Sequence, residues 1–562
     1  MKKTIHCQLL LIWLIWVVNV MGISSSFAIE PLPSSEENPI LIENVQGFVI
    51  LGTINPSERP SIDQPGIHFA EIDVPGGEKG LRKKLEKYIG QSLTADDLQE
   101  IKKDIILYYR DHNHPLVFVW IPEQQITYGT LLLVVKESVL DQIRVYGNEY
   151  FSAQRYADAI QVKEGEPIDE NLLLNNLNFI NRNPFRRVDL IYAPGADKQT
   201  TDIDLVVKDR FPVSLYAGVD NTGLVHTDRT RWFMGFTWAN AFNLDQILTF
   251  QYTAAPDYHK FDAVTVSYTI PLPIQHTLLF YGGYSQVNVH LPKSSRTHGS
   301  SAQASVRYDI PVSPSPWLLH EVICGFDFKR SNNTVEFVEN SPVIGQEVNL
   351  TQFTCGYNLG YERDHRTWSH KVGFDFQLFF SPFAWIPDQS EKDFKTLNPF
   401  ATHTYVYGRT SLNYKIRLPK GFQWNALAAM QLSSQSLLPS EQFGLGGYNT
   451  VRGYEERQLN ADDGLLLSTE IRSPKLRLFK KCGKCKINDA LEFLLFLDYG
   501  LAHDNHRLSG EKQTDYVFGT GPGIRYAIEN YLTARLDWGI KLHRDHFPGG
   551  WSMVHFSVIG SF

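Results

Sequence analysis

Long apolar runs and cysteines are scarce in this 562-residue sequence. After residue 28 no stretch of about 18 apolar residues occurs, which excludes a protein that crosses a membrane with helices. The sequence has five cysteines, and so few in an oxidising compartment do not form a disulfide framework. The formal net charge of −8 shows no excess of basic residues and removes any charge-based case for nucleic-acid binding.

Aromatic residues and glycine are abundant instead. The chain contains 34 Phe, 26 Tyr, 11 Trp and 40 Gly, and 43% of its residues are hydrophobic. The hydrophobic residues are scattered in short alternating pieces, and this distribution is typical of β-strands. The sequence therefore predicts a protein rich in β-structure, either soluble or embedded in a membrane as a barrel.

The amino terminus has the pattern of a secretory signal peptide. Lys2 and Lys3 precede an apolar run over residues 9–20, and small residues follow at 24–28. We expect residues 1–28 to be this signal, and an amino-terminal membrane anchor is the alternative interpretation. Residues 29–66, rich in Pro, Ser, Glu and Asn with one strand-like piece at 45–51, are expected to form an extended segment or linker.

Residues 67–210 carry a mixed helix and strand pattern that occurs twice, at 67–137 and 138–210. The expected strands are 67–74, 115–121 and 129–136 in the first copy and 139–146, 185–192 and 201–208 in the second. Each copy has two helices between its first and second strands. Thr94 and Asp97 fit the capping box of one of these helices. Ile72 and Ile143 fall in equivalent strands, so the sequence predicts a tandem β-α-α-β-β repeat.

Residues 211–562 show strands only. In Tyr531–Leu542 every second residue is apolar, and the intervening face carries charge. A soluble sandwich strand rarely runs so long without a break, whereas a strand of a membrane barrel does. We expect about 16 antiparallel strands joined alternately by short turns and longer polar loops. A soluble β-helix or sandwich is the alternative, and the terminal strand ending in Phe562 suits recognition by barrel-assembly machinery.

Enzyme motifs are missing or out of context. The sequence has no Gly-x-Ser-x-Gly and no His-Glu-x-x-His, and Gly519-x-Gly521-x-Gly523 is better interpreted as a glycine-rich barrel strand than as a phosphate loop. Cys482 and Cys485 form a lone C-x-x-C, for which a local disulfide or two free thiols is favoured over zinc. We therefore expect no enzyme activity, no cofactor and no metal.

The connection between the expected strands 422–433 and 464–475 is the most informative one. Its segment Gly444–Tyr454 is dense in glycine around a single arginine, Arg452. Asp498 lies on the polar face of the strand 491–503, and an inward carboxylate in a barrel invites a basic partner. We predict that the loop folds into the lumen and is held to the wall by Arg452 and Asp498. Both residues could instead be ordinary solvated charges.

These motifs resemble those of two-partner secretion transporters (TpsB proteins of the ShlB, FhaC and HecB type) and of BamA-like barrels. Val451, Arg452, Gly453 and Tyr454 match the loop motif, and Phe496, Asp498 and Gly500 match the wall motif that receives its arginine. The two repeats are similar to POTRA domains. Residues similar to the POTRA motifs of this family are Ile121, Pro122 and Gln124 in the first repeat and Asn181, Asn183, Pro184 and Phe185 in the second.

The resemblance implies an outer-membrane translocase with POTRA domains in the periplasm and a barrel in the lipid. Its partner would be a large secreted protein of the TpsA type, such as a haemolysin or adhesin. Many members begin with a helix that plugs the pore, but residues 29–66 show no convincing amphipathic helix. A barrel-insertion factor of the same superfamily is the alternative function. A surface enzyme and a passive porin agree less well with the sequence.

Overall fold

The computed structural model describes residues 39–53, 65–124, 126, 128–291, 295–312, 318–337, 344–364, 369–479, 487–544, 547 and 549–562. It separates into two compact units, residues 1–137 and 138–562. The expected signal segment 1–28 and the C-x-x-C of Cys482 and Cys485 lie outside the described residues. None of the helices in the described part is long and apolar enough to cross a membrane.

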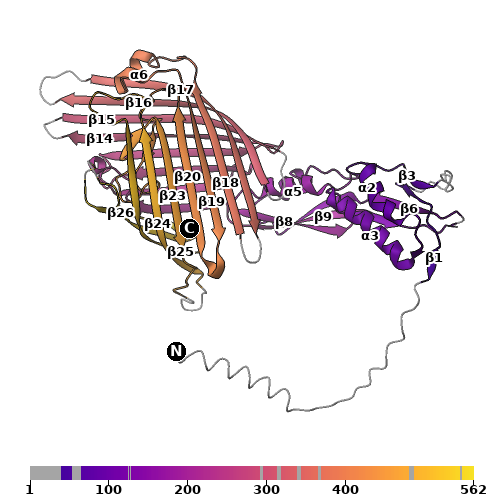
Figure 1. The fold of residues 1–562 in the computed structure, drawn as a ribbon. Coiled ribbons are helices and arrows are strands. Elements are labelled where there is room, and N and C mark those ends of the chain that lie inside the picture. Colours follow the sequence, from indigo (N-terminus) through magenta and orange to yellow (C-terminus); the bar gives the residue numbers. More distant parts are fainter. Residues whose placement is uncertain are drawn as a thin grey trace, which may run out of the picture. The chain divides into compact units, whose positions relative to one another are not determined.

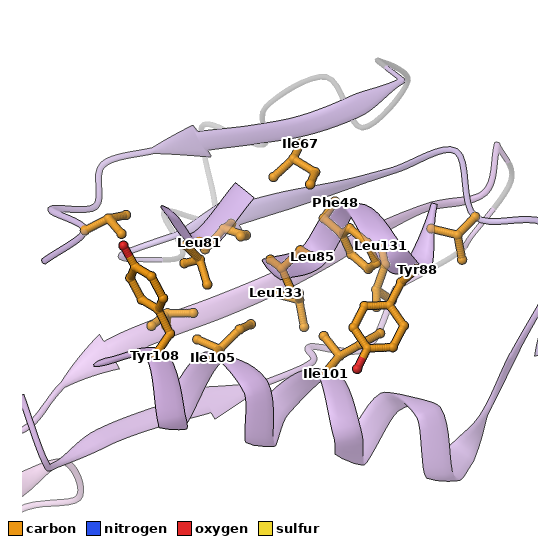
Figure 2. Packing of buried hydrophobic residues seen from close by; sticks show 14 of the residues in the cluster. Phe48, Ile67, Leu81, Leu85, Tyr88, Ile101, Ile105, Tyr108, Leu131 and Leu133 are labelled. Atoms are coloured by element: carbon orange, nitrogen blue, oxygen red, sulfur yellow. The ribbon is translucent and has the colours of Figure 1, made fainter. Parts of the chain in front are cut away.

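The first unit is a small domain in which two helices pack on a four-stranded sheet. The strand order is β3-β2-β6-β5, with β2 Gly47–Leu51, β3 Gly66–Ala70, β5 Val117–Trp120 and β6 Thr130–Glu137. The other elements are β1 Ile40–Ile42, α2 Glu78–Leu85, η1 Glu86–Tyr88, β4 Leu93–Thr94 and α3 Ala95–Asp111. Figure 2 shows the core between sheet and helices, in which Phe48, Leu85, Ile101 and Leu133 are wholly buried.

The expectation of a linker at 29–66 is wrong for residues 47–51. Strand β2 lies inside the sheet between β3 and β6, pairs in parallel with both, and is buried along its whole length. A strand buried on both faces is apolar at successive positions, and Phe48–Leu51 has this composition. Strand β2, and not the strand that begins near Ile67, is therefore the counterpart of the first strand of the second repeat, and β3 is an addition.

Helix α3 begins as the sequence predicts, and the capping box is confirmed. The backbone N–H of Asp97 donates to the Thr94 hydroxyl (3.4 Å), and the Thr94 N–H donates to the Asp97 carboxylate (2.8 Å). Because the Thr94 hydroxyl (2.7 Å) and the Thr94 N–H both donate to the charged carboxylate, the pKa of Asp97 lies below its usual range. The cap fixes the rotation of α3, so that Ile101 and Ile105 face the sheet.

The second unit begins with a domain of the same plan. Its strands are β7 Val139–Tyr146, β8 Arg186–Pro194 and β9 Thr200–Asp209, and its helices are α4 Ala153–Asp158 and α5 Glu170–Ile180. The strand order is β7-β9-β8, and β7 pairs with β9 in parallel as β2 pairs with β6. The β-α-α-β-β order predicted for this copy is confirmed.

A closed barrel of 16 antiparallel strands follows, which confirms the predicted number (Figure 1). The strands are β10 Val213–Asp220, β11 Arg231–Ala241, β12 Gln246–Ala254, β13 Phe261–Pro271, β14 Thr277–Leu291, β15 Ser295–Pro311, β16 Leu318–Phe337, β17 Ile344–Asp364, β18 Ser369–Ser381, β19 Tyr405–Arg417, β20 Gln423–Ser433, β23 Asp463–Arg472, β24 Asp489–His503, β25 Thr514–Ile528, β26 Leu532–Lys541 and β27 Ser552–Ser561. The connections between the barrel strands contain η2 Val225–Thr227, α6 Glu391–Leu397, η3 Pro419–Gly421 and the short strands β21 Phe443–Leu445 and β22 Leu459–Ala461. Strand β10 pairs with β27 and closes the barrel.

The wall is apolar outside and polar inside. Along β24 the side chains of Phe493, Leu495 and Leu497 are exposed, whereas Phe496 and Asp498 on the alternate positions are buried. Alternation with the apolar face outward is the pattern of a barrel in lipid. Short turns such as 272–276 and 529–531 join strands at the end next to the second domain, where 473–488 is a longer connection, and the long connections 382–404 and 434–462 leave the wall at the opposite end.

We predict that Thr94→Ala destabilises the start of α3 by about 1 kcal/mol, because the N–H groups of the first turn lose their acceptor. Hydrogen exchange of the full-length protein should then show the first-turn amides of α3 exchanging about fivefold faster. Thr94→Ser keeps the hydroxyl and serves as the control. Equal exchange in the alanine and serine variants would contradict the prediction.

Candidate functional site: a loop folded into the barrel lumen

The connection between β20 and β23 turns back into the barrel. We call residues 443–461 the lumen loop, in which β21 and β22 pair as a short hairpin. Gly446, Gly447 and Gly453 have φ values of 103°, 105° and 100°, which side chains rarely adopt. At Gly453 a Cβ would also lie 3.0 Å from the backbone of Gly539 in β26. Glycine is therefore required where the loop meets the wall.

Arg452 is the centre of the contact between loop and wall. Its Nε and Nη2 each donate to the carboxylate of Asp498 at 2.7 Å, and its backbone N–H donates to the same group at 3.1 Å. Arg452 is only 3% exposed and Asp498 is not exposed at all. The planar fork of arginine matches a carboxylate in this geometry. The structure thus brings together the loop residue and the wall residue that the sequence paired.

A wider set of charges surrounds this pair. Arg452 Nη1 donates to Glu470 (2.6 Å), the guanidinium lies 3.6 Å from the ring centre of Phe496, and Asp537 is 3.7 Å away. Burial disfavours the charged guanidinium, but the hydrogen bonds and charges of Asp498 and its neighbours outweigh it and raise the pKa of Arg452. The arginine therefore stays charged in the lumen.

The acidic residues of this set are paired in turn with further arginines. Asp537 accepts hydrogen bonds from Arg525 (2.7 and 3.0 Å) and Arg535 (2.7 Å), and Glu470 accepts from Arg472 (2.8 Å). The sequence prediction missed these wall residues. Their signal was present, because each of them occupies an inward position of its strand, but nothing in the sequence shows which inward charges meet.

The remaining motif residues pack the loop against the wall. Val451 and Tyr454 are wholly buried, and the Tyr454 hydroxyl accepts from the backbone N–H of Phe518 (3.1 Å). A Cβ on Gly500 would lie 3.0 Å from both Leu445 and Val451, so the glycine of the wall motif makes room for the loop. A Cβ on Gly519 would strike the carbonyl of Arg452. The glycine-rich strand expected around Gly519 is therefore a close-contact surface.

Glu441, just before the lumen loop, forms a second buried anchor that the sequence prediction also missed. Its carboxylate has no exposed surface and accepts hydrogen bonds from Lys329 (2.8 and 2.9 Å), Tyr407 (2.6 Å) and Gln352 (3.2 Å). These partners come from β16, β17 and β19, whereas Arg452 is held by β23 and β24. The loop is thus attached to the wall on both sides of β20.

The Asn181 and Asn183 motif lies where the second domain meets the barrel. The Asn181 side chain pairs with the backbone of Val188 (2.9 and 2.7 Å), and Asn183 Nδ2 donates to the carbonyl of Ala239 in β11 (2.9 Å). Arg186 forms two hydrogen bonds to Asp245 in the next turn (2.6 and 2.8 Å). Phe185 is buried and Pro184 is exposed. The motif therefore joins the domain to the end of the barrel.

In the first-domain motif, at the end of β5, a side-chain amide likewise pairs with the backbone of one residue. The Gln124 side chain donates to the carbonyl of Leu132 (2.9 Å) and accepts from its N–H (2.8 Å), which holds the segment after β5 against β6. Ile121 packs against the domain core, and the Pro122 carbonyl accepts from Gln124 (3.3 Å). This motif and the lumen loop belong to different units of the chain.

Within the described ranges, no group of three His, Cys, Asp or Glu side chains is arranged to hold a metal ion. Cys324 and Cys355 are opposite each other on β16 and β17 and are exposed as free thiols. The charges in the lumen are paired with one another by short hydrogen bonds. This arrangement fixes the loop in place.

Comparison with known families gives two matches. A model described as haemolysin secretion/activation protein ShlB/FhaC/HecB matches residues 199–526, and one described as POTRA domain, ShlB-type, matches residues 66–138. The heme/hemopexin transporter protein HuxB of Haemophilus influenzae is 23% identical over 492 residues, which cover 81% of this chain and 80% of HuxB. The outer membrane transporter CdiB of Dickeya dadantii is 19% identical, over 68% of this chain and 67% of its own.

Solved structures show the same fold. CdiB from Escherichia coli superposes with a TM-score of 0.75 at 16% identity, covering 95% of this chain and 93% of that one. CdiB from Acinetobacter baumannii gives a TM-score of 0.64 at 17% identity, covering 99% and 98%. Because the described strands close a barrel of the same kind, the fold class predicted from the sequence is confirmed.

We predict that Arg452→Ala lowers the free energy of unfolding of the barrel by about 3–5 kcal/mol, because Asp498 is left buried without its cation. Denaturant unfolding of the full chain in detergent measures this change. Arg330→Ala, which removes an arginine paired with Glu347 at a half-exposed site of the wall, should cost less than about 1 kcal/mol. Equal losses in the free energy of unfolding of the two variants would show that the buried pair stabilises the barrel no more than the half-exposed pair does.

Proposed function

The chain belongs to the ShlB/FhaC/HecB family of haemolysin secretion/activation proteins, which are outer-membrane secretion transporters, and from this premise we propose its cargo and route. The cargo is one large secreted protein of the TpsA type. It is held in the periplasm by the two small domains and passes to the cell surface through the barrel. The resemblance noted in the sequence is confirmed by the family match over more than half of the chain.

The sheets of the two small domains support the capture step. In the second domain β7 and β8 are the outer strands of the sheet, and in the first domain β3 and β5 are. An outer strand presents unpaired N–H and C=O groups to an incoming extended segment. Main-chain hydrogen bonds of this kind make little demand on cargo sequence, so the same edges can hold successive parts of a long chain.

The barrel supports the passage step. A barrel of 16 strands is wide enough for an aqueous channel, and the inward positions of this one carry polar and charged side chains. Since the sequence has no nucleotide-binding motif, we propose that folding of the cargo outside the cell draws it outward. The observation that carries the proposal is the lumen loop, which Arg452 and Asp498 hold inside a barrel whose inward positions carry polar and charged side chains.

The domain end of the barrel is proposed to face the periplasm. Most of its connections are short turns, 473–488 being longer, and the second domain is attached there through Asn183 and Arg186. Short periplasmic turns and longer external loops are the usual arrangement in outer-membrane barrels. The terminal strand is proposed to be the part that barrel-assembly machinery recognises during insertion.

Deletion of the gene tests the cargo proposal. We expect one large exported protein to disappear from the culture medium and cell surface, while the amounts of other outer-membrane proteins stay unchanged. A plasmid copy of the gene should restore export. General loss of outer-membrane proteins would instead indicate a barrel-insertion factor, and no change in either would contradict a transport function.

We also predict that Arg452→Ala and Asp498→Ala each reduce export of that protein about tenfold or more, since the expected loss of anchoring exceeds the 1.4 kcal/mol that corresponds to a factor of ten. The variants should still reach the outer membrane, which is checked by immunoblotting of membrane fractions. Arg330→Ala is the matched control. Normal export by both variants at normal membrane levels would show that the anchor is dispensable.

A further inference from the structure

The first and last strands of the barrel, β10 and β27, pair over a shorter stretch than β10 and its other neighbour, β11. We call the pairing of β10 with β27 the seam. It joins Tyr216–Asp220 to Ser557–Ser561, whereas β10 pairs with β11 from Val213 to Asp220. Opening it would leave unpaired backbone groups facing lipid, where they cannot be hydrated. Contacts that hold the two strands together therefore matter more here than elsewhere in the wall.

The lumen loop contacts both sides of the seam. Towards β27, the Gly453 N–H donates to Nε2 of His555 (3.0 Å), and the Tyr448 hydroxyl lies 2.7 Å from the Ser557 hydroxyl. On the other side, Glu455 forms a two-point ion pair with Arg229 (2.5 and 3.0 Å), which lies on the connection between β10 and β11, two residues before β11 begins. One short loop segment, 448–455, thus contacts β27 and the connection that joins β10 to β11.

A side chain next to β10 continues the pairing of the seam. Asn221 Nδ2 donates to the carbonyl of Val554 (2.7 Å), and the Phe556 N–H donates to Asn221 Oδ1 (2.9 Å). The amide therefore takes the place of a backbone pair beyond Asp220. Together with the loop contacts, it holds the end of β10 to β27 on the side where the lumen loop lies.

The wall beside the seam, from β10 to β15, leaves space in the lumen. A cavity of about 380 Å³ lies against the inner face of β10 and β12–β15. Its lining includes the polar side chains of Thr249, Gln251, Ser267, Tyr281 and Gln303. An extended polar chain could follow this face without displacing the residues that hold the lumen loop.

We propose that the lumen loop holds the seam closed during transport, with Arg229 and His555 as its positioning residues, so that cargo leaves through the lumen and β10 does not part from β27. The route rests on the proposed function, whereas the holding of the seam is a property of the transporter alone. The closed seam separates this protein from one that releases a client sideways into lipid.

A disulfide across the seam tests the route. Val219 and Val558 are Cα partners, and partners of an antiparallel pair lie within the Cα separation that a disulfide needs. In a background with Cys324, Cys355, Cys482 and Cys485 changed to serine, V219C/V558C should form the bond and export cargo as well when oxidised as when reduced. Loss of export on oxidation, restored by reductant, would overturn the route. Phe250 and Val266, partners on β12 and β13, give the matched control F250C/V266C.

Hydrogen exchange of the purified transporter without cargo tests the holding of the seam. Arg229→Glu and Glu455→Arg should each speed exchange of seam amides about two- to fivefold relative to amides of β13 and β14, and the double exchange of charge should restore the slow rate. His555→Leu removes the acceptor for Gly453 and should act in the same way, whereas His555→Gln keeps an acceptor and should not. Unchanged seam exchange in the single variants, or equal acceleration in β13 and β14, would overturn the proposal. These results stand even if no cargo is found.

Discussion

A guanidinium that water scarcely reaches requires matched negative charge, and this requirement organises the inner wall of the barrel. Arg452 can remain charged in the lumen because Asp498, Glu470 and Asp537 lie around it. Those carboxylates are themselves buried, and each needs its own donors, which adjacent strands supply. Because β23, β24, β25 and β26 follow one another around the wall, satisfying one loop arginine also fixes the order and register of the strands behind it.

Close approach of backbone to backbone is the second condition, and it applies to both partners. The loop can reach the wall only because Gly453 lacks a side chain, and the wall can receive it only because Gly500, Gly519 and Gly539 do as well. The charge network gives the contact its strength, and the glycines set the distance at which the network can form. The charge network and the glycine contacts are therefore both needed for the loop to bind the wall.

The sequence allowed the barrel, its strand number and the pairing of Arg452 with Asp498 to be predicted, because alternation and local motifs carry that information. It did not predict that His555 would meet the loop, that Asn221 would meet β27 or that Glu441 would be bound by the wall, since each contact joins residues far apart in the chain, whose register no local pattern records. The strand at 45–51 was predicted, but it was assigned to a linker and not to the first domain, because its burial depends on partners such as Thr130, which lies 83 residues after Gly47. The start of α3 was predicted well, since its capping box depends on neighbours three residues apart, whereas α6, with a capping box at Ser390 and Asp393, was missed because strands alone were expected in 211–562.

The two small domains share a plan, but the extra strand β3 makes them unequal. In the second domain the first strand, β7, forms the border of its sheet, whereas in the first domain the corresponding strand, β2, is enclosed between β3 and β6. A segment that added to the first strand of one domain would find that position in the other already filled by the protein's own chain. The repeat has therefore diverged into two modules that cannot replace each other: exchanging or duplicating one of them would change which backbone edges are open, even with every core residue preserved.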